Sequence, residues 1–192
     1  MSNIIKDNNK EKSTKGFDFS KFMNTYGIVV ILVVMIVGIS AKNPQFLSIN
    51  NIMNLLTQSS MYGILALGML LVIVSKGIDL SVGSVLALSA VVTASVSQVA
   101  DATSKMYPGM PMVPIAASIV IALGIGALCG YINGALIAHT RIPAFIATLG
   151  MYTAARGAAL MYAEGKPISN LNPALEFLGS RIFTIIPIPV VI

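Results

Sequence analysis

Charged residues are scarce in this sequence. Only 10% of its 192 residues are Asp, Glu, Lys or Arg, whereas 56% are apolar, and the mean hydropathy is +0.85. Soluble domains average about 25% charged residues, so this composition excludes an ordinary soluble globular fold. It instead predicts an all-α polytopic bundle of transmembrane helices.

Side chains that bind metals or attack substrates are also scarce. Cys129 is the single cysteine, so no disulfide can form within these residues, and we interpret it as a small packing residue. His139 is the single histidine and lies in AHTRIP without an acidic neighbour, which favours an interfacial side chain over a catalytic one. The sequence has neither a G-x-x-x-x-G-K-[ST] phosphate loop nor an H-E-x-x-H motif. We therefore expect no catalytic, cofactor-binding or metal-binding residue, and no ATP hydrolysis by this chain.

Long apolar runs dominate the rest of the sequence. Residues 1–21 are polar and lysine-rich, and we expect them to form a flexible cytoplasmic tail before a membrane domain of residues 22–192. A final apolar run begins at Ile182 and is too short to span, so we expect it to be the start of a sixth helix in a chain truncated at its C-terminus. Five complete spans are expected at residues 22–41, 52–74, 80–100, 114–138 and 144–163.

Lys and Arg are unevenly divided between the two sides of these spans. The tail side holds Lys6, Lys10, Lys12, Lys15, Lys21, Lys76 and Arg141, and the other side holds Lys42, Lys105, Lys166 and Arg181. Because cytoplasmic loops carry the excess of Lys and Arg, the N-terminus is predicted to be cytoplasmic. The formal net charge of +5 thus bears on membrane orientation, and we expect no nucleic acid partner.

The motif SKGIDLSVGS, residues 75–84, separates the second and third apolar runs. Gly77 permits a sharp backbone turn. Asp79 is placed to cap the third helix, because a carboxylate accepts hydrogen bonds from the free amides of a first helical turn. We predict a tight, capped helix junction formed by Lys76, Gly77, Asp79 and Ser81.

Glycines recur at helical spacing in the fourth run. Gly126, Gly130 and Gly134 lie on one helix face, where another backbone can approach closely. We interpret this face as helix packing, with a pore-lining or moving seam as the alternative.

Polar side chains inside the runs are the candidates for solute contact, because a charge in hydrocarbon is costly unless it faces protein or water. Arg156, well inside the fifth run, either bonds carbonyl groups at a bundle interface or lines a solute path. The neutral side chains can bond hydroxyl groups of a solute or groups of another helix. The candidate path residues are Asn54, Gln58, Asn133 and Arg156.

Two long blocks of the sequence contain several motifs in a fixed order. The first combines NNIMNLLTQSSMYGILALGMLLVIVSKG with GIDLSVGSVLAL, and the second is GALCGYINGALIAHTRIPAFIATLGMYTAARGAALMYAEGKPIS. Both resemble the permease subunits of bacterial sugar ABC importers of the ribose, galactose and xylose class. The second block matches the N-G-x-L-I-A turn, the P-x-F-I-x-T-L-G segment and the R-G helix of that family. The resemblance covers about residues 26–192.

This resemblance implies a transporter subunit of the bacterial inner membrane that works by alternating access. Such a subunit pairs with a second permease copy and receives sugar from an extracytoplasmic binding protein. Two cytoplasmic ATPase subunits drive it and hold the ATP and Mg. Permeases of the family have about ten spans and an ATPase-docking loop after the sixth, so these 192 residues are expected to be unable to transport alone.

Two segments point to different sugars. DATSKMYPGMPMVPIA is similar to the corresponding loop of galactose-type permeases, whereas GIDLSVGS is closer to the ribose-type form. Two other classes of function stay as alternatives. An ion-coupled secondary transporter normally needs carboxylates inside the membrane, but Asp79 and Glu164 lie at the ends of runs. A non-transporting membrane scaffold would make the motif blocks coincidental.

Overall fold

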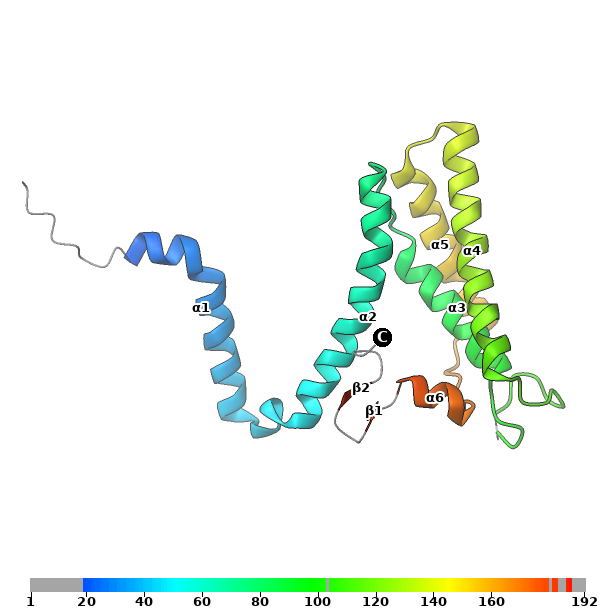
Figure 1. The fold of residues 1–192 in the computed structure, drawn as a ribbon, viewed down its shortest axis with the longest axis horizontal. Coiled ribbons are helices and arrows are strands. Elements are labelled where there is room, and N and C mark those ends of the chain that lie inside the picture. The colour runs from blue at the N-terminus through cyan, green and yellow to red at the C-terminus, as the bar shows by residue number, and fades with distance from the viewer. Residues whose placement is uncertain (1–18, 103, 180, 183–185, 188–192) are drawn as a thin grey trace, which may run out of the picture. The chain divides into compact units, whose positions relative to one another are not determined.

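The computed structural model describes residues 19–102, 104–179, 181–182 and 186–187 (Figure 1). Most of these residues are helical, as the composition predicted. The elements in chain order are α1 (Phe19–Lys42), the 3-10 helix η1 (Pro44–Leu47), α2 (Ile49–Val74), α3 (Val82–Val96), α4 (Ile115–Thr140), α5 (Ala144–Tyr162), α6 (Pro173–Gly179), β1 (Arg181–Ile182) and β2 (Ile186–Pro187).

The chain divides into two compact units, residues 1–51 and residues 52–192. In the first unit, α1 begins at Phe19, three residues before the expected span, so the helix includes Lys21. The remainder of the expected tail, residues 1–18, lies outside the described residues. Asn43 then caps η1, because its Oδ1 accepts from the N–H of Gln45 at 3.1 Å.

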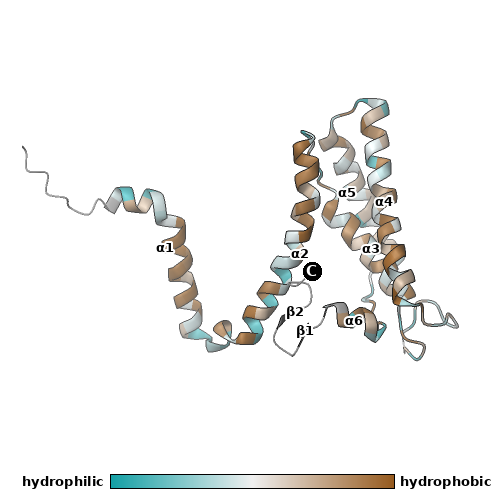
Figure 2. Ribbon diagram, in the orientation of Figure 1, coloured by the Kyte–Doolittle hydropathy of each residue, from teal (hydrophilic) through white to brown (hydrophobic). Residues whose placement is uncertain are grey.

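Three helices of the described chain are long and apolar enough to cross a membrane: Ser20–Lys42 within α1, then α2 and α4. Figure 2 shows hydrophobic residues along the length of these helices. This result confirms a helical membrane protein. α3 has 15 residues, or about 22 Å at 1.5 Å per residue, which is shorter than the expected span because residues 80–81 before it and residues 97–100 after it are not helical. α5 has 19 residues but a lower mean hydropathy, since Arg156 and several small residues lie within it.

The end of the described chain differs from the expected start of a sixth helix. Ile182 lies in β1 and pairs with Ile186 of β2 in an antiparallel register. The described residues after 180 are therefore extended, and the other residues of the expected run lie outside those described. Before them, α6 begins with Pro173, and the Oδ1 of Asn172 accepts from the N–H of Ala174 at 2.9 Å, which caps this helix.

The packed core of the second unit consists of α3, α4 and α5, with α3 in contact with both of the others. The buried side chains at these contacts are small, which lets the helices approach closely in the absence of a hydrophobic drive within lipid. They include Ser84, Thr93, Ser95, Ala147, Thr148, Ala155 and Ala159.

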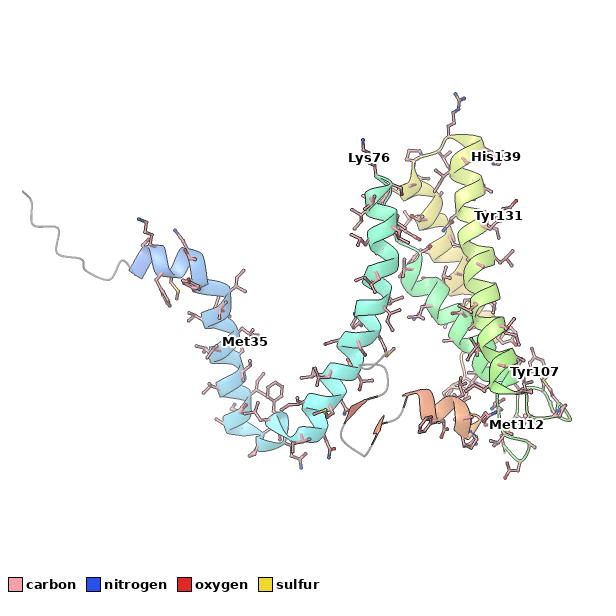
Figure 3. All side chains as sticks on the ribbon, in the orientation of Figure 1. Met35, Lys76, Tyr107, Met112, Tyr131 and His139 are labelled. Carbon is pink, nitrogen blue, oxygen red and sulfur yellow. The ribbon has the colours of Figure 1, made fainter. Side chains whose placement is uncertain are left out.

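The connections of the second unit lie at alternate ends. Lys76, after α2, and His139, at the end of α4, lie at one end, whereas Tyr107 and Met112, in the loop between α3 and α4, lie at the other (Figure 3). This alternation is the arrangement expected of helices that cross a membrane back and forth. The α2–α3 and α4–α5 junctions therefore share one side of the unit.

Candidate functional site

The turn that ends α2 has a defined geometry. Lys76 adopts a left-handed conformation with φ of 60°. Its N–H donates to Ile73 O at 2.9 Å, and the N–H of Gly77 donates to Val72 O at 3.0 Å, which is the Schellman pattern of helix termination. We expected Gly77 to take the unusual backbone conformation, but Lys76 takes it. Gly77 instead avoids close contacts, since a Cβ there would lie 3.3 Å from Val72 Cγ1 and 3.4 Å from Val72 O.

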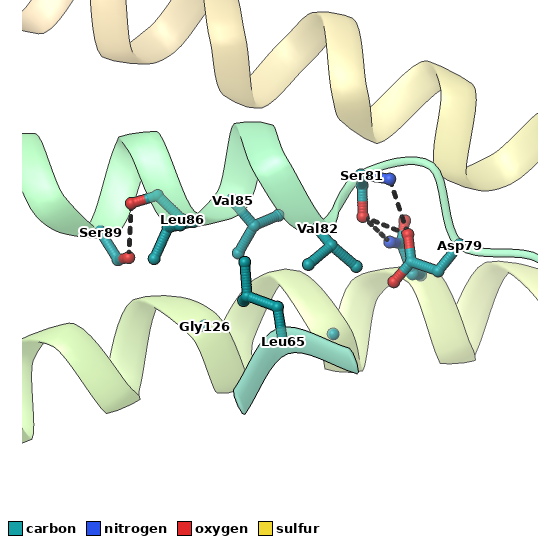
Figure 4. Close-up of a pocket in the computed structure, with 10 residues that line it drawn as sticks. Leu65, Asp79, Ser81, Val82, Val85, Leu86, Ser89 and Gly126 are labelled. Atoms are coloured by element: carbon teal, nitrogen blue, oxygen red, sulfur yellow. Dashed lines mark hydrogen bonds between the residues drawn. The ribbon is translucent and has the colours of Figure 1, made fainter. Parts of the chain in front are cut away.

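Asp79 orders the segment before α3 but is not its N-cap. α3 begins at Val82, and Ser81 occupies the N-cap position. The Oδ1 of Asp79 accepts two hydrogen bonds from Ser81, one from its N–H at 2.7 Å and one from its hydroxyl at 2.6 Å (Figure 4). The expected role is thus corrected: the carboxylate stabilises the turn that leads into the helix, while the amides of the first helical turn are not its partners.

Thr148 of α5 holds the same junction from the other side. Its Oγ1 accepts from the N–H of Leu80 at 3.2 Å. The same hydroxyl lies 3.2 Å from Ile78 O and 3.3 Å from Phe145 O, between which its single hydrogen is shared. No local pattern in the sequence indicates Thr148, because these junction partners are 68 and 70 residues away from it along the chain.

A hydrogen-bond chain links this junction to α4. The hydroxyl hydrogen of Ser81 is taken by Asp79, so its oxygen can only accept from the Nδ2 of Asn133, which lies 3.1 Å away. This requirement fixes the orientation of the Asn133 amide. Its Oδ1 consequently points away from Ser81, and this buried atom has no hydrogen-bond partner in the described part of the chain. We call Asp79, Ser81 and Asn133 the polar relay.

The polar relay lies at the wall of a recess of about 270 Å³ between α3 and α4, on the side that α2 faces (Figure 4). Apolar side chains from α2 and α3, two glycines of α4, the polar relay and Ser89 line it. Among the lining residues Asp79 alone is charged. The full lining is Leu65, Asp79, Ser81, Val82, Val85, Leu86, Ser89, Gly126, Gly130 and Asn133.

The glycine face of α4 is open in this structure. A Cβ added at Gly126, Gly130 or Gly134 would meet no atom within 4 Å. No helix of the described residues therefore packs closely on this face. Helix packing there stays a prediction, and it would need a partner helix that is not among the described residues. Gly126 and Gly130 line the recess, which corresponds to the alternative of a lined seam.

The candidate path residues do not come together. Asn133 is 5% exposed and lines the recess, whereas Asn54 and Gln58 are exposed on α2 and do not line it. Arg156 is exposed on α5 and lines a different recess of about 340 Å³, together with Lys166. The structure thus places one of the four beside the helix junction.

A second polar cluster lies at the opposite end of the unit. Gln98 is 1% exposed, and its Nε2 donates to Ser169 O at 3.0 Å and to Ser104 O at 3.2 Å, while its Oε1 accepts from Met106 N–H at 2.8 Å. This side chain ties the loop after α3 to the loop after α5. Sequence reasoning gave no signal for it, since a glutamine at the end of an apolar run is not distinctive.

Charged and phenolic groups also meet at this end. The hydrogen bond between the Tyr107 and Tyr162 hydroxyls, which are 2.7 Å apart, raises the pKa of Tyr107, and desolvation raises it further. The exposed ion pair between Glu164 and Lys166, at 2.6 Å, lowers the pKa of Glu164 and raises that of Lys166. Because this pair is fully exposed, water and salt screen it.

Comparisons with known proteins give consistent results. A family model described as "Branched-chain amino acid transport system / permease component" matches residues 51–184. The galactose/methyl galactoside import permease protein of Escherichia coli (strain K12) is 40% identical over 157 residues, which cover 80% of this chain and 47% of that protein. The ribose import permease protein of Haemophilus influenzae is 36% identical over 184 residues, or 94% of this chain and 53% of that protein.

The ribose import permease protein of Bacillus subtilis (strain 168) is 36% identical over 191 residues, which cover 97% of this chain and 55% of that protein. The chain therefore spans about half the length of the curated relatives that it matches. No solved structure matches it significantly.

Proposed function

This chain belongs to the permease-component family of branched-chain amino acid transport systems, and we propose that it is a membrane-spanning permease subunit of an ATP-driven sugar importer. The observation that carries the proposal is the similarity, over 80% or more of this chain, to import permeases named for galactose, methyl galactoside and ribose. In this proposal the chain moves solute and catalyses no reaction, and separate subunits hydrolyse ATP.

The membrane topology that we propose has five complete spans and the start of a sixth, with residues 1–21 as a cytoplasmic tail. The alternate ends of the helix connections support it (Figure 3). α3 is short for a span, but α4 and α5 pack against it, and a short helix with irregular flanks is tolerated at membrane depth where protein surrounds it. The lysines of the tail support a cytoplasmic N-terminus in the bacterial inner membrane.

The proposed partners are a second permease copy, cytoplasmic ATPase subunits and an extracytoplasmic sugar-binding protein. The recess beside the polar relay supports a solute path, because Gly126 and Gly130 of α4 and Leu65 of α2 line it without filling it. In alternating access, a path of this kind opens to one side of the membrane at a time. Helices that do not pack closely on each other can move relative to one another, as this opening requires.

Uptake by a reconstituted importer tests the proposal. The full-length permease, its ATPase and its binding protein are placed in proteoliposomes, and entry of radiolabelled ribose, galactose, xylose and leucine is measured with ATP. We expect ATP-dependent entry of at least one sugar, and none when the ATPase carries a substitution of its phosphate-loop lysine. Entry of leucine alone would overturn the sugar assignment, and entry driven by an ion gradient without ATP would overturn the importer class.

A further inference from the structure

Asn133, which lines the recess beside the polar relay, carries a buried hydrogen-bond acceptor with a fixed orientation and no partner in the described chain. Asn133 is 5% exposed, and its Oδ1 has no partner among the residues that the structure describes. The bond between Asn133 Nδ2 and Ser81 Oγ holds the amide in one orientation. A buried carbonyl oxygen without a partner is costly, and a donor from a molecule in the recess would relieve that cost.

Asp79 provides a second acceptor at the same place. Its Oδ1 receives both hydrogen bonds from Ser81, while its Oδ2 receives none from the described residues. The side chain is half-buried and lines the recess. Two side chains that line the recess, Asn133 and Asp79, therefore each carry an oxygen acceptor without a partner among the described residues.

The charge and polarity of the lining restrict the class of molecule. The lining includes one carboxylate and no Lys, Arg or His, which disfavours an anion. Leu65, Val82, Val85 and Leu86 supply an apolar wall near the two acceptors. A compound with several hydroxyl donors and apolar C–H faces matches this combination, since binding sites pair apolar walls with a few placed polar groups.

We propose that this recess is a binding station for an uncharged polyhydroxyl solute, with Asn133 Oδ1 and Asp79 Oδ2 each accepting a hydrogen bond from a solute hydroxyl. The inference rests on the proposed function, to which it adds a position and two contact residues. Ser81 is a positioning residue, because it orients both acceptors. The glycine face of α4 leaves the space that the solute needs.

Replacing Asn133 tests the contact in the full-length permease assembled with its ATPase and binding protein. Asn133→Leu keeps the approximate size but removes the acceptor, so we expect sugar uptake to fall by about 3- to 10-fold, which corresponds to the loss of one net hydrogen bond. Thr93→Val is the matched control, because Thr93 Oγ1 is also buried without a partner in the described chain but does not line the recess. The control should transport like the unaltered protein.

Asp79→Asn separates an uncharged solute from a cation. An uncharged solute can bond the asparagine amide, so uptake should persist at a reduced rate, whereas a cationic solute would lose its counter-charge and its uptake would be abolished. Abolition with normal assembly would therefore contradict the assignment to an uncharged compound.

A second measurement applies if Asn133→Leu fails to assemble. In a Cys129→Ser background of the permease–ATPase complex, Ser89→Cys places a thiol in the recess lining, and Ser104→Cys places one in the exposed loop at the other end. A small water-soluble methanethiosulfonate should label both. Ribose or galactose at millimolar concentration should slow labelling at position 89 and leave position 104 unchanged.

The outcomes separate the two claims. If the unaltered complex imports none of the tested sugars, the proposed function fails. If it imports a sugar but Asn133→Leu transports like Thr93→Val, the assignment of the recess fails while the importer function stands. The assignment also fails if sugar does not protect the cysteine at position 89, or if that cysteine is unreactive because another protein segment covers the recess.

Discussion

The hydroxyl of Ser81 accepts a hydrogen bond from the amide of Asn133 at 3.1 Å, across 52 residues of sequence. Both side chains are buried, at 1% and 5% exposure. Since the same hydroxyl donates to Asp79, a single serine connects the α2–α3 junction to α4. The shape of the junction and the orientation of the buried Asn133 amide oxygen therefore depend on each other.

Ser81→Ala should destabilise the permease by about 1–3 kcal/mol, because it leaves the buried Nδ2 of Asn133 without a partner. Unfolding of the full-length protein in mixed micelles measures this free energy. Ser89→Ala is the control, since the Ser89 hydroxyl bonds only to Leu86 O of its own helix among the described residues. Equal losses of stability in the two variants would contradict a linking role for Ser81.

Asp79→Asn and Asp79→Ala should differ in their effect on assembly. The asparagine oxygen can accept both hydrogen bonds from Ser81, so this variant should reach the membrane at a normal level. Alanine removes that acceptor and should cost about 1 kcal/mol. The amount of folded permease in membranes is measured for both variants and should be lower for Asp79→Ala. Equal amounts would show that the turn does not need the acceptor.

Thr148→Val should loosen the junction, because it removes the hydroxyl that bonds Leu80 and Ile78. The expected loss is about 0.5–1.5 kcal/mol, with faster proteolysis between residues 75 and 81. Thr153→Val provides the comparison, since in the described part of the chain the exposed Thr153 hydroxyl bonds only to carbonyl groups of its own helix. Equal rates of proteolysis between residues 75 and 81 in the two variants would exclude the role given to Thr148.

Gly130→Leu should block sugar uptake by filling the recess, while Gly134→Leu should have a smaller effect. Both glycines belong to the same open face of α4, but Gly130 lines the recess and Gly134 does not. Uptake by the reconstituted importer, corrected for the amount of assembled complex, measures the difference. If Gly134→Leu were the more harmful, helix packing and not solute space would explain this face.

The junction shows what could be predicted from the sequence and what could not. Lys76 and Asp79 stood out because charges are rare between apolar runs, and the structure does place a tight turn there. The residues that occupy two positions of the turn differ from the prediction. Amino-acid preferences favour Gly at a left-handed position and Asp at a helix N-cap, but Lys76 is the left-handed residue and Ser81 is the N-cap. Thr148 gave no local signal, since its role depends on a contact far along the chain.

The candidate path residues illustrate the same limit of local patterns. Asn54, Gln58 and Asn133 are similar as polar side chains in apolar runs, yet only Asn133 is buried. Periodicity gives the face of a helix, but it does not give the neighbour that the face meets. The orientation of the Asn133 amide required Ser81, which belongs to another helix junction.

A structure of the full-length permease with its ATPase, determined with a transported sugar bound, tests the central claim most directly. We predict sugar density in the recess between α3 and α4, with a hydroxyl at about 2.7–3.0 Å from Asn133 Oδ1. A recess filled by another helix, with Asn133 Oδ1 bonded to a protein group and the sugar elsewhere, would contradict it.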